Sequence, residues 1–131
     1  MRPHHDLRVW QDAMALVTRI YEVTVDFPAD ERFGLTAQLR RAAVSVPSNV
    51  AEGAARGGRK EFVHLLTIAR GSLSELDTQL RIAVNLGFSS SLDSLLVDIE
   101  RLQASPGALI KSQRDPSLHT IHHSQTAKPS N

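Results

Sequence analysis

The sequence predicts an all-α protein, an antiparallel up-down four-helix bundle. Apolar residues recur at three- and four-residue steps over four long segments, and no strand-like alternation of useful length appears. The connections between these segments are short, so consecutive helices should pack as antiparallel neighbours. A chain of 131 residues that is 41% hydrophobic and 5% aromatic suits one domain with an aliphatic core.

The first expected helix runs from residue 6 to about residue 26, with an apolar face from Trp10 to Tyr21. It ends before Pro28, which forces the preceding residue toward extended geometry. The second runs from about residue 35 to the Gly57-Gly58 pair. Pro47 lies inside it and cannot donate to the carbonyl of Ala43, so we expect a bend there, with a penalty of about 3 kcal/mol unless neighbours compensate.

The third expected helix spans about residues 59 to 86, has near-heptad apolar spacing and stops at Gly87. A fourth begins at a capping box formed by Ser90 and Asp93, and Pro106-Gly107 should kink or end it. These limits predict an N-terminal arm (1–5), a bundle (6–110) and a disordered tail (111–131). The tail has too few apolar residues to offset the entropy of ordering.

Polar residues accompany Pro47 and its expected partners on the third helix. If the turn centres on Gly58, antiparallel pairing joins residues whose numbers sum to about 116, which sets Ser45 opposite Gly71 and Glu52 opposite His64. Small residues at 45 and 71 would allow a close crossing, and nearby polar groups would satisfy the carbonyl left free by Pro47. We interpret the set as a structural polar seam, with a ligand pocket or a subunit interface as alternatives: Ser45, Pro47, Asn49, Glu52, His64 and Arg70.

Basic residues concentrate between Arg32 and Lys60, although the formal net charge of the chain is only +1. Such a patch could hold a phosphate backbone. The residues that we expect to bind nucleic acid are Arg40, Arg41, Arg56, Arg59 and Lys60. Alternatively, ion pairs use these cations, Arg41 with Glu75 and Arg40 with Asp77. The turn residues Arg56, Arg59 and Lys60 have only Glu61 as an expected carboxylate partner.

No nucleophile, base and orienting group stand together, so the sequence predicts no enzyme and no cofactor. The stretch GAARGGR lacks the Lys-Ser/Thr pair of a phosphate-binding loop and follows a helix instead of a strand. His119, His122 and His123 would share a helical face but lack a scaffold, so we expect no metal site. The absence of cysteine and of a long apolar run predicts a cytoplasmic protein that does not enter membranes.

Three long motifs add a family resemblance: DLRVWQDAMAL, ERFGLTAQLRRAAVSVPSNVAEGAARG and EFVHLLTIARGSLSELDTQLRIAVNLGF. Together they resemble the four-helix bundle family of proteins encoded by intervening sequences of 23S ribosomal RNA genes, over roughly residues 5 to 105. The resemblance implies a homopentameric ring with no established enzymatic activity. The family is similar in fold to the accessory variability protein of diversity-generating retroelements, which implies nucleic acid and a reverse transcriptase as partners.

From these observations we expect a non-enzymatic helical bundle that binds RNA or DNA through backbone charge, as an accessory to another nucleic-acid enzyme. The alternative is an oligomeric protein-interaction scaffold without a nucleic-acid role. Contacts between subunits should use apolar positions left outside each bundle, such as Leu7, Val9 and Val63.

Overall fold

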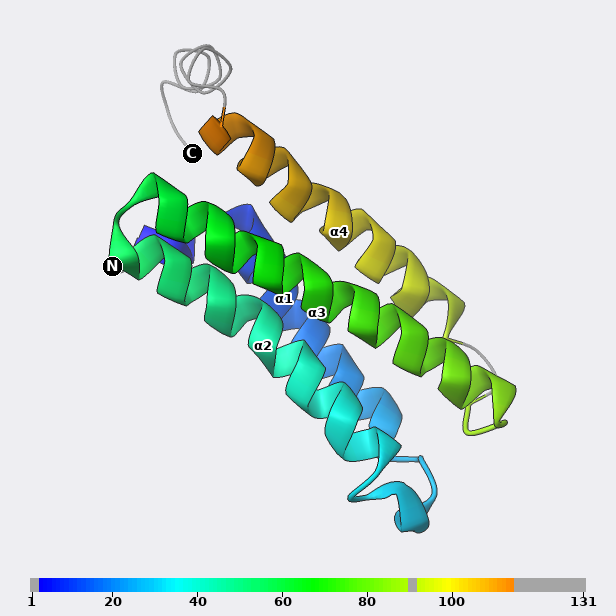
Figure 1. Cartoon of the computed structure of the whole chain (residues 1–131). Helices are drawn as coiled ribbons and strands as arrows, with labels where there is room; N and C mark the ends of the chain where they lie inside the picture. Colours follow the sequence, from blue (N-terminus) through cyan, green and yellow to red (C-terminus); the bar gives the residue numbers. More distant parts are fainter. Residues whose placement is uncertain (1–2, 90–91, 115–131) are drawn as a thin grey trace.

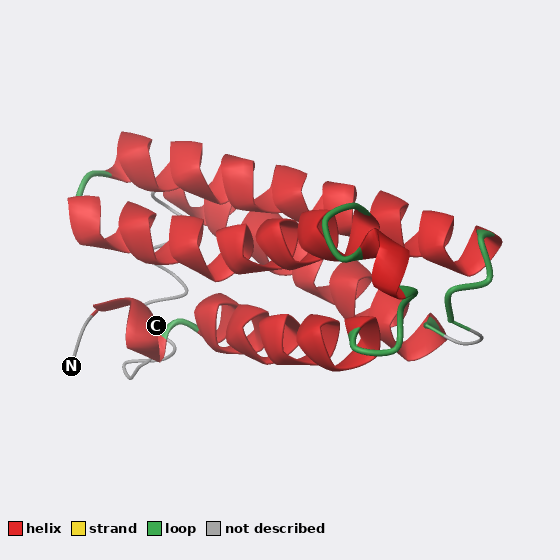
Figure 2. Ribbon diagram, turned by 90° about the horizontal axis from the view of Figure 1, so that it is seen from below, coloured by secondary structure: helices red, strands yellow, loops and turns green. Residues whose placement is uncertain are grey.

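The structure is a computed structural model that describes residues 3–89 and 92–114. These residues form four α-helices and no strand, which confirms the all-α class and the four-helix bundle (Figure 1, Figure 2). The short 3-10 helices η1 (Pro3–Asp6) and η2 (Ala29–Glu31) precede the first and second of them. The α-helices are α1 (Arg8–Thr24), α2 (Leu35–Arg56), α3 (Arg59–Asn85) and α4 (Asp93–Arg114).

Side-chain hydrogen bonds between α2 and α3 define the direction and register of this pair. As residue numbers rise along α2 they fall along α3, so the two helices run antiparallel. The bonded partners have numbers that sum to 117, one more than the expected 116. They are Gln38 with Gln79, Ser45 with Ser72, and Arg56 with Glu61.

The core takes aliphatic side chains from all four helices, and α3 contributes more of the largest fully buried ones than any other helix. Leu66, Leu73, Leu76 and Leu80 of α3 are completely buried. Full burial of one such side chain stabilises the fold by about 1.5–3 kcal/mol. The periodic apolar face of the third segment is therefore the centre of the bundle, packed between α2 and α4.

Two prolines lie inside continuous helices, and both are buried. α2 runs through Pro47 as expected. α4 also runs through Pro106 to Arg114, so of the two outcomes expected at Pro106-Gly107, a kink or an end, the end is wrong. Proline keeps a φ compatible with a helix, and burial of its ring offsets the lost backbone hydrogen bond. Residues 111–114 of the expected tail are helical, and its remainder, 115–131, lies outside the described residues.

Glycines end α2 and follow α3 as the sequence predicts. Gly57 and Gly87 have φ values of 78° and 77°, in the left-handed region that closes a helix at low steric cost. At the start of α2 the cap comes from the preceding 3-10 turn, where a carboxylate oxygen of Glu31 accepts a hydrogen bond from the backbone N–H of Leu35 at 2.9 Å. Ser90 of the expected capping box lies outside the described residues.

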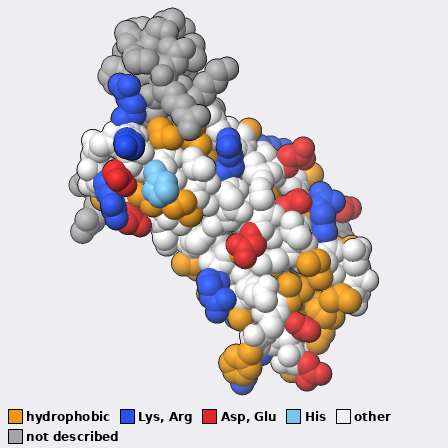
Figure 3. All heavy atoms as spheres, in the orientation of Figure 1, with side chains coloured by type: hydrophobic (Ala, Val, Ile, Leu, Met, Phe, Trp, Pro, Cys, Tyr) orange, Lys and Arg blue, Asp and Glu red, His pale blue; other side chains and the backbone are white. Residues whose placement is uncertain are grey.

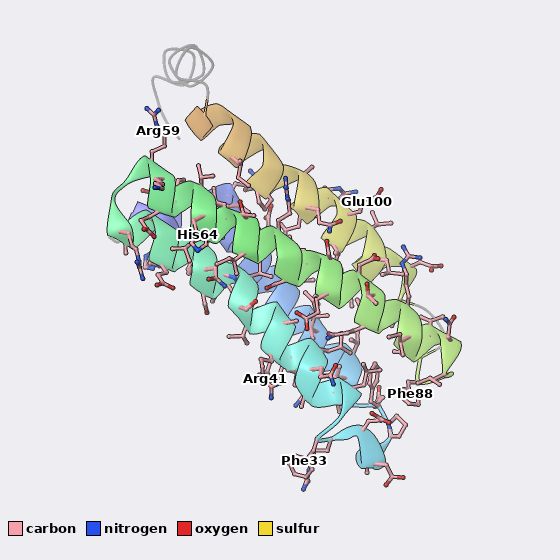
Figure 4. All side chains as sticks on the ribbon, in the orientation of Figure 1. Phe33, Arg41, Arg59, His64, Phe88 and Glu100 are labelled. Carbon is pink, nitrogen blue, oxygen red and sulfur yellow. The ribbon has the colours of Figure 1, made fainter. Side chains whose placement is uncertain are left out.

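The bundle has two distinct ends. The α2–α3 turn, the beginning of α1 and the last turns of α4 lie at one end (Figure 1). η2 and the connection that leaves α3 lie at the other, where Figure 4 shows Phe33 and Phe88 far from Arg59. A residue early in α2 therefore lies near η2, whereas a residue late in α2 lies near the α2–α3 turn.

Candidate nucleic-acid interface

The polar seam forms around Ser45 and Asn49. The Ser45 hydroxyl lies 2.5 Å from that of Ser72 and 3.0 Å from the Ala42 carbonyl. Because a hydroxyl has one proton, Ser45 donates to Ala42 and accepts from Ser72. The Asn49 amide donates to the Ser45 carbonyl at 2.7 Å. These bonds reach the carbonyls of residues 42 and 45, not that of Ala43, so they do not satisfy the group that Pro47 leaves free.

The close approach between α2 and α3 occurs at Gly53, not at Gly71 as expected. A Cβ atom built on Gly53 would lie 3.0 Å from the Phe62 ring and 3.2 Å from the Leu65 Cβ. A Cβ atom on Gly71 would meet nothing within 4 Å. The register shift by one residue explains part of this error, because it places Ser72 instead of Gly71 opposite Ser45.

The other seam residues do not join this cluster. Glu52 binds Arg56 on its own helix at 2.5 Å, so the expected pairing of Glu52 with His64 is wrong. His64 is exposed on α3 (Figure 4). Arg70 lies against α4, where its Nη1 atom would be 3.3 Å from a Cβ on Gly107. The six residues therefore form no common pocket. The absence of a side chain at Gly107 leaves room for the Arg70 guanidinium beside α4.

The five expected nucleic-acid-binding residues are split between two regions. Arg40 and Arg56 are sixteen positions apart on α2, which corresponds to about 24 Å. Figure 4 shows Arg41 on the part of α2 nearer Phe33, whereas Arg59 lies at the opposite end. A cluster that is continuous in sequence is thus not continuous in space, because it follows a long helix.

Arg40 has a structural role, but its partner differs from the expected one. Its Nε donates to the Thr24 hydroxyl at 2.9 Å, and its guanidinium carbon lies 4.5 Å from the centroid of the Tyr21 ring. Asp77 instead accepts a hydrogen bond from Arg81 at 3.0 Å. This bond, and then the charge of Asp77, raises the pKa of Arg81 above its ordinary value. Arg41 is exposed and has no hydrogen bond or ion pair among the described residues.

At the α2–α3 turn, Arg56 contacts two carboxylates, Glu52 at 2.5 Å and Glu61 at 3.5 Å. The expectation that only Glu61 could partner it was therefore incomplete. Arg59 and Lys60, which we call the turn cations, are exposed and have no ion-pair partner in the part of the chain that the structure describes. Arg56 can neutralise only one of the two carboxylates bordering the turn, so Arg56, Arg59 and Lys60 together exceed Glu52 and Glu61 by one positive charge.

A shallow pocket of about 380 Å³ lies beside Arg59, one of the two turn cations. The α3 N-terminus at Gly58 has no side-chain cap, so the positive end of its helix dipole is open on this side. Figure 3 shows basic, acidic and histidine side chains close together at this end, and a larger group of hydrophobic side chains toward the other. The pocket is lined by Leu7, Gly53, Ala54, Gly57, Gly58, Arg59 and Phe62.

A second hollow, the α1–α4 groove, was missed by sequence reasoning. It has a volume of about 320 Å³ and an apolar floor between charged walls. The spacing of Arg8, Asp12 and Arg19 places them on one side of α1, but the sequence does not show which other helix lies next to that side. The residues lining the groove are Arg8, Asp12, Ala15, Leu16, Arg19, Asp98, Arg101, Leu102 and Ser105.

The apolar residues expected between subunits are used inside the bundle. Val9 is buried in the core, and Leu7 and Val63 pack against it. Other large hydrophobic residues are exposed instead, above all Phe33 at 86% and Val25 at 71%. The amphipathic pattern could not separate these roles, because half-buried and exposed flanks adjoin on every helix.

The described residues contain no group of three or more side chains suited to hold a metal ion. His119, His122 and His123 lie outside them. None of the described helices is both long and apolar enough to cross a membrane.

The fold and the two charged sites define a four-helix bundle whose polar surfaces lie at one end and along one side. The family model of the 23S rRNA-intervening sequence protein matches residues 5–105. The chain therefore belongs to the family of 23S rRNA-intervening sequence proteins. No curated protein matches the sequence.

Proposed function

We propose that this protein is a non-enzymatic, cytoplasmic nucleic-acid-binding bundle that holds phosphates at the turn cations. The observation that carries the proposal is the exposure of Arg59 and Lys60 at a glycine turn without an ion-pair partner among the described residues. A Cβ on Gly57 or Gly58 would meet nothing within 4 Å, so the turn is open to a ligand. Backbone charge binds any sequence, which suits a site without a base-reading platform.

The family name is compatible with an RNA ligand. RNA is therefore the first nucleic acid to test, with DNA as the second. A role as an accessory to another nucleic-acid enzyme, such as a reverse transcriptase, extends this proposal to a protein partner.

The test is to reverse both turn cations in the variant Arg59→Glu/Lys60→Glu and to leave Arg56 in place, because Arg56 holds Glu52 and Glu61. Two lost phosphate contacts that become repulsions should weaken binding of RNA by about 100-fold. The matched control Arg32→Glu/Arg81→Glu makes the same change in net charge at the opposite end of the bundle and should retain most of the affinity. Equal loss in both variants, or no binding by the parent at low salt, would reject the proposal.

We further propose that the helices form an up-down bundle that assembles into a homo-oligomer, a ring of five. The antiparallel register of α2 and α3 supports the topology. The exposed side chains of Met14 and Tyr21 on α1, and of Val25 at its C-cap, support an assembly because they lie at helical spacing and a partner subunit could bury them. The same exposed apolar residues favour the second candidate function, a protein-interaction scaffold. Sedimentation of the variant Met14→Glu/Val25→Glu should show smaller species than the parent, and unchanged sedimentation would place the contact elsewhere.

A further inference from the structure

The α1–α4 groove begins next to the turn cations. Leu7 lines the pocket at the turn, and the following residue, Arg8, lines the groove. We propose that a single nucleic-acid strand held at the turn continues along this groove, with its backbone phosphates on Arg8 and Arg101. The inference rests on the proposed function and extends it, since it assigns the path of the ligand and its single-stranded form.

Arg19 has a structural position in the groove. It forms an ion pair with Asp98 and also donates to the Ser94 hydroxyl at 2.9 Å, which joins α1 to α4. Its side chain is 36% exposed. An arginine with two partners on the facing helix is not free to follow a ligand.

Arg8 and Arg101 differ from Arg19 in exposure and in the length of their contacts. Their side chains are 84% and 78% exposed. Arg8 approaches Asp12 only to 3.7 Å, and Arg101 approaches Asp98 only to 3.9 Å. Contacts of this length between exposed groups contribute little stability, so replacing either carboxylate with a phosphate would cost little free energy.

The charges of the groove match one phosphodiester group. Three arginines and two aspartates line it. Since Arg19 neutralises Asp98, the remaining Arg8, Arg101 and Asp12 carry one net positive charge. A backbone phosphate carries one negative charge and would be attracted by this excess. Asp12 by itself would repel the phosphate.

The floor and the size of the groove favour a single strand over a duplex. Ala15 supplies exposed apolar surface on which a sugar or a base can rest, above the buried side chains of Leu16 and Leu102. A volume of about 320 Å³ is at the lower end of the range for small-ligand sites, which is suited to one nucleotide unit at a time.

The test measures binding of a fluorescein-labelled oligouridylate of about 12 nucleotides by fluorescence anisotropy. Arg101→Ala should weaken binding by about 10-fold and lower the slope of log affinity against log salt by about 0.7, the value for one lost contact to a single strand. Arg8→Ala should behave in the same way. The matched control Arg32→Ala removes an exposed arginine outside the groove and should change affinity by less than about 2-fold.

A substitution that is expected to tighten binding provides a second test. Asp12→Asn removes the carboxylate that repels the phosphate and should tighten binding by about 3-fold. Asp26→Asn makes the same change in net charge outside the groove and should have no comparable effect. Circular dichroism would verify that each variant keeps the helical content of the parent.

The outcomes separate the groove from the turn. Normal binding by Arg101→Ala and Arg8→Ala, together with loss in Arg59→Glu/Lys60→Glu, would overturn the groove and leave the proposed function intact. Absence of binding by the parent would overturn both. If a duplex of the same length lost as much affinity on Arg101→Ala, the single-strand assignment would be wrong. A deoxythymidylate strand of the same length would show whether the groove prefers RNA or DNA. Weaker binding of either strand by Arg101→Ala would support the groove.

Discussion

The two sides of the bundle differ in how their helices meet. α2 and α3 approach closely at Gly53, above a row of fully buried leucines. Hydrogen bonds between neutral side chains join them, and the Arg56–Glu61 ion pair adds a charged contact at the turn. α1 and α4 meet through the ion pair of Arg19 with Asp98 and leave a charged groove beside it. Close packing stabilises the first pair, whereas the second keeps polar side chains accessible at its surface. The proposed strand path therefore runs along the less closely packed helix pair, while the turn cations lie at one end of the closely packed pair.

The largest expected effect concerns the buried row of α3. Leu73→Ala should destabilise the protein by about 3–4 kcal/mol, because the surrounding helices cannot close the cavity. Leu102→Ala removes the same atoms beside the α1–α4 groove, where water can enter, and should cost about 2 kcal/mol or less. Urea unfolding would measure both, and equal costs would show that the two sides are packed alike.

The next effect distinguishes two glycines of the α2–α3 pair. Gly53→Val should destabilise the protein by about 2 kcal/mol, since the added methyl groups would press on Phe62 and Leu65. Gly71→Ala has free space and should stabilise α3 by about 0.5–1 kcal/mol. Thermal unfolding decides between them. If Gly53→Val stabilised the protein instead, α2 and α3 would not be closely packed at Gly53.

The smallest effect is expected from the ion pair of the other side. Asp98→Asn should cost no more than about 1 kcal/mol, because both side chains are more than a third exposed. The cost should shrink further at high salt. A loss as large as that of Leu73→Ala would contradict the division between a packed and a polar side.

Local patterns were sufficient to predict the helices but not their contacts. The four apolar faces, the stop at Gly57 and the buried leucines of α3 follow from periodicity and glycine geometry. Pro106 misled the prediction because its tolerance within α4 depends on burial of the ring. Arg40 was assigned to the wrong partner, since nothing local indicates that it bonds Thr24 of α1 instead of Asp77 of α3.

The candidate site was predictable only in part for the same reason. Arg59 and Lys60 could be identified from sequence because the residues that flank a turn are known once its glycines are recognised. Arg8 and Arg101 could not, because they belong to helices at opposite ends of the chain. Their proximity follows from packing between α1 and α4, which no short motif encodes.

Cross-linking of a photoreactive strand most directly tests whether the ligand follows the turn and the groove. A single-stranded RNA with 4-thiouridine would be bound, irradiated and digested, and the cross-linked residues would be located by mass spectrometry. We predict cross-links in residues 7–19, 56–62 and 98–105, and loss of the first and third groups in Arg8→Ala/Arg101→Ala. Cross-links confined to residues 26–34, or spread evenly over all four helices, would contradict the account.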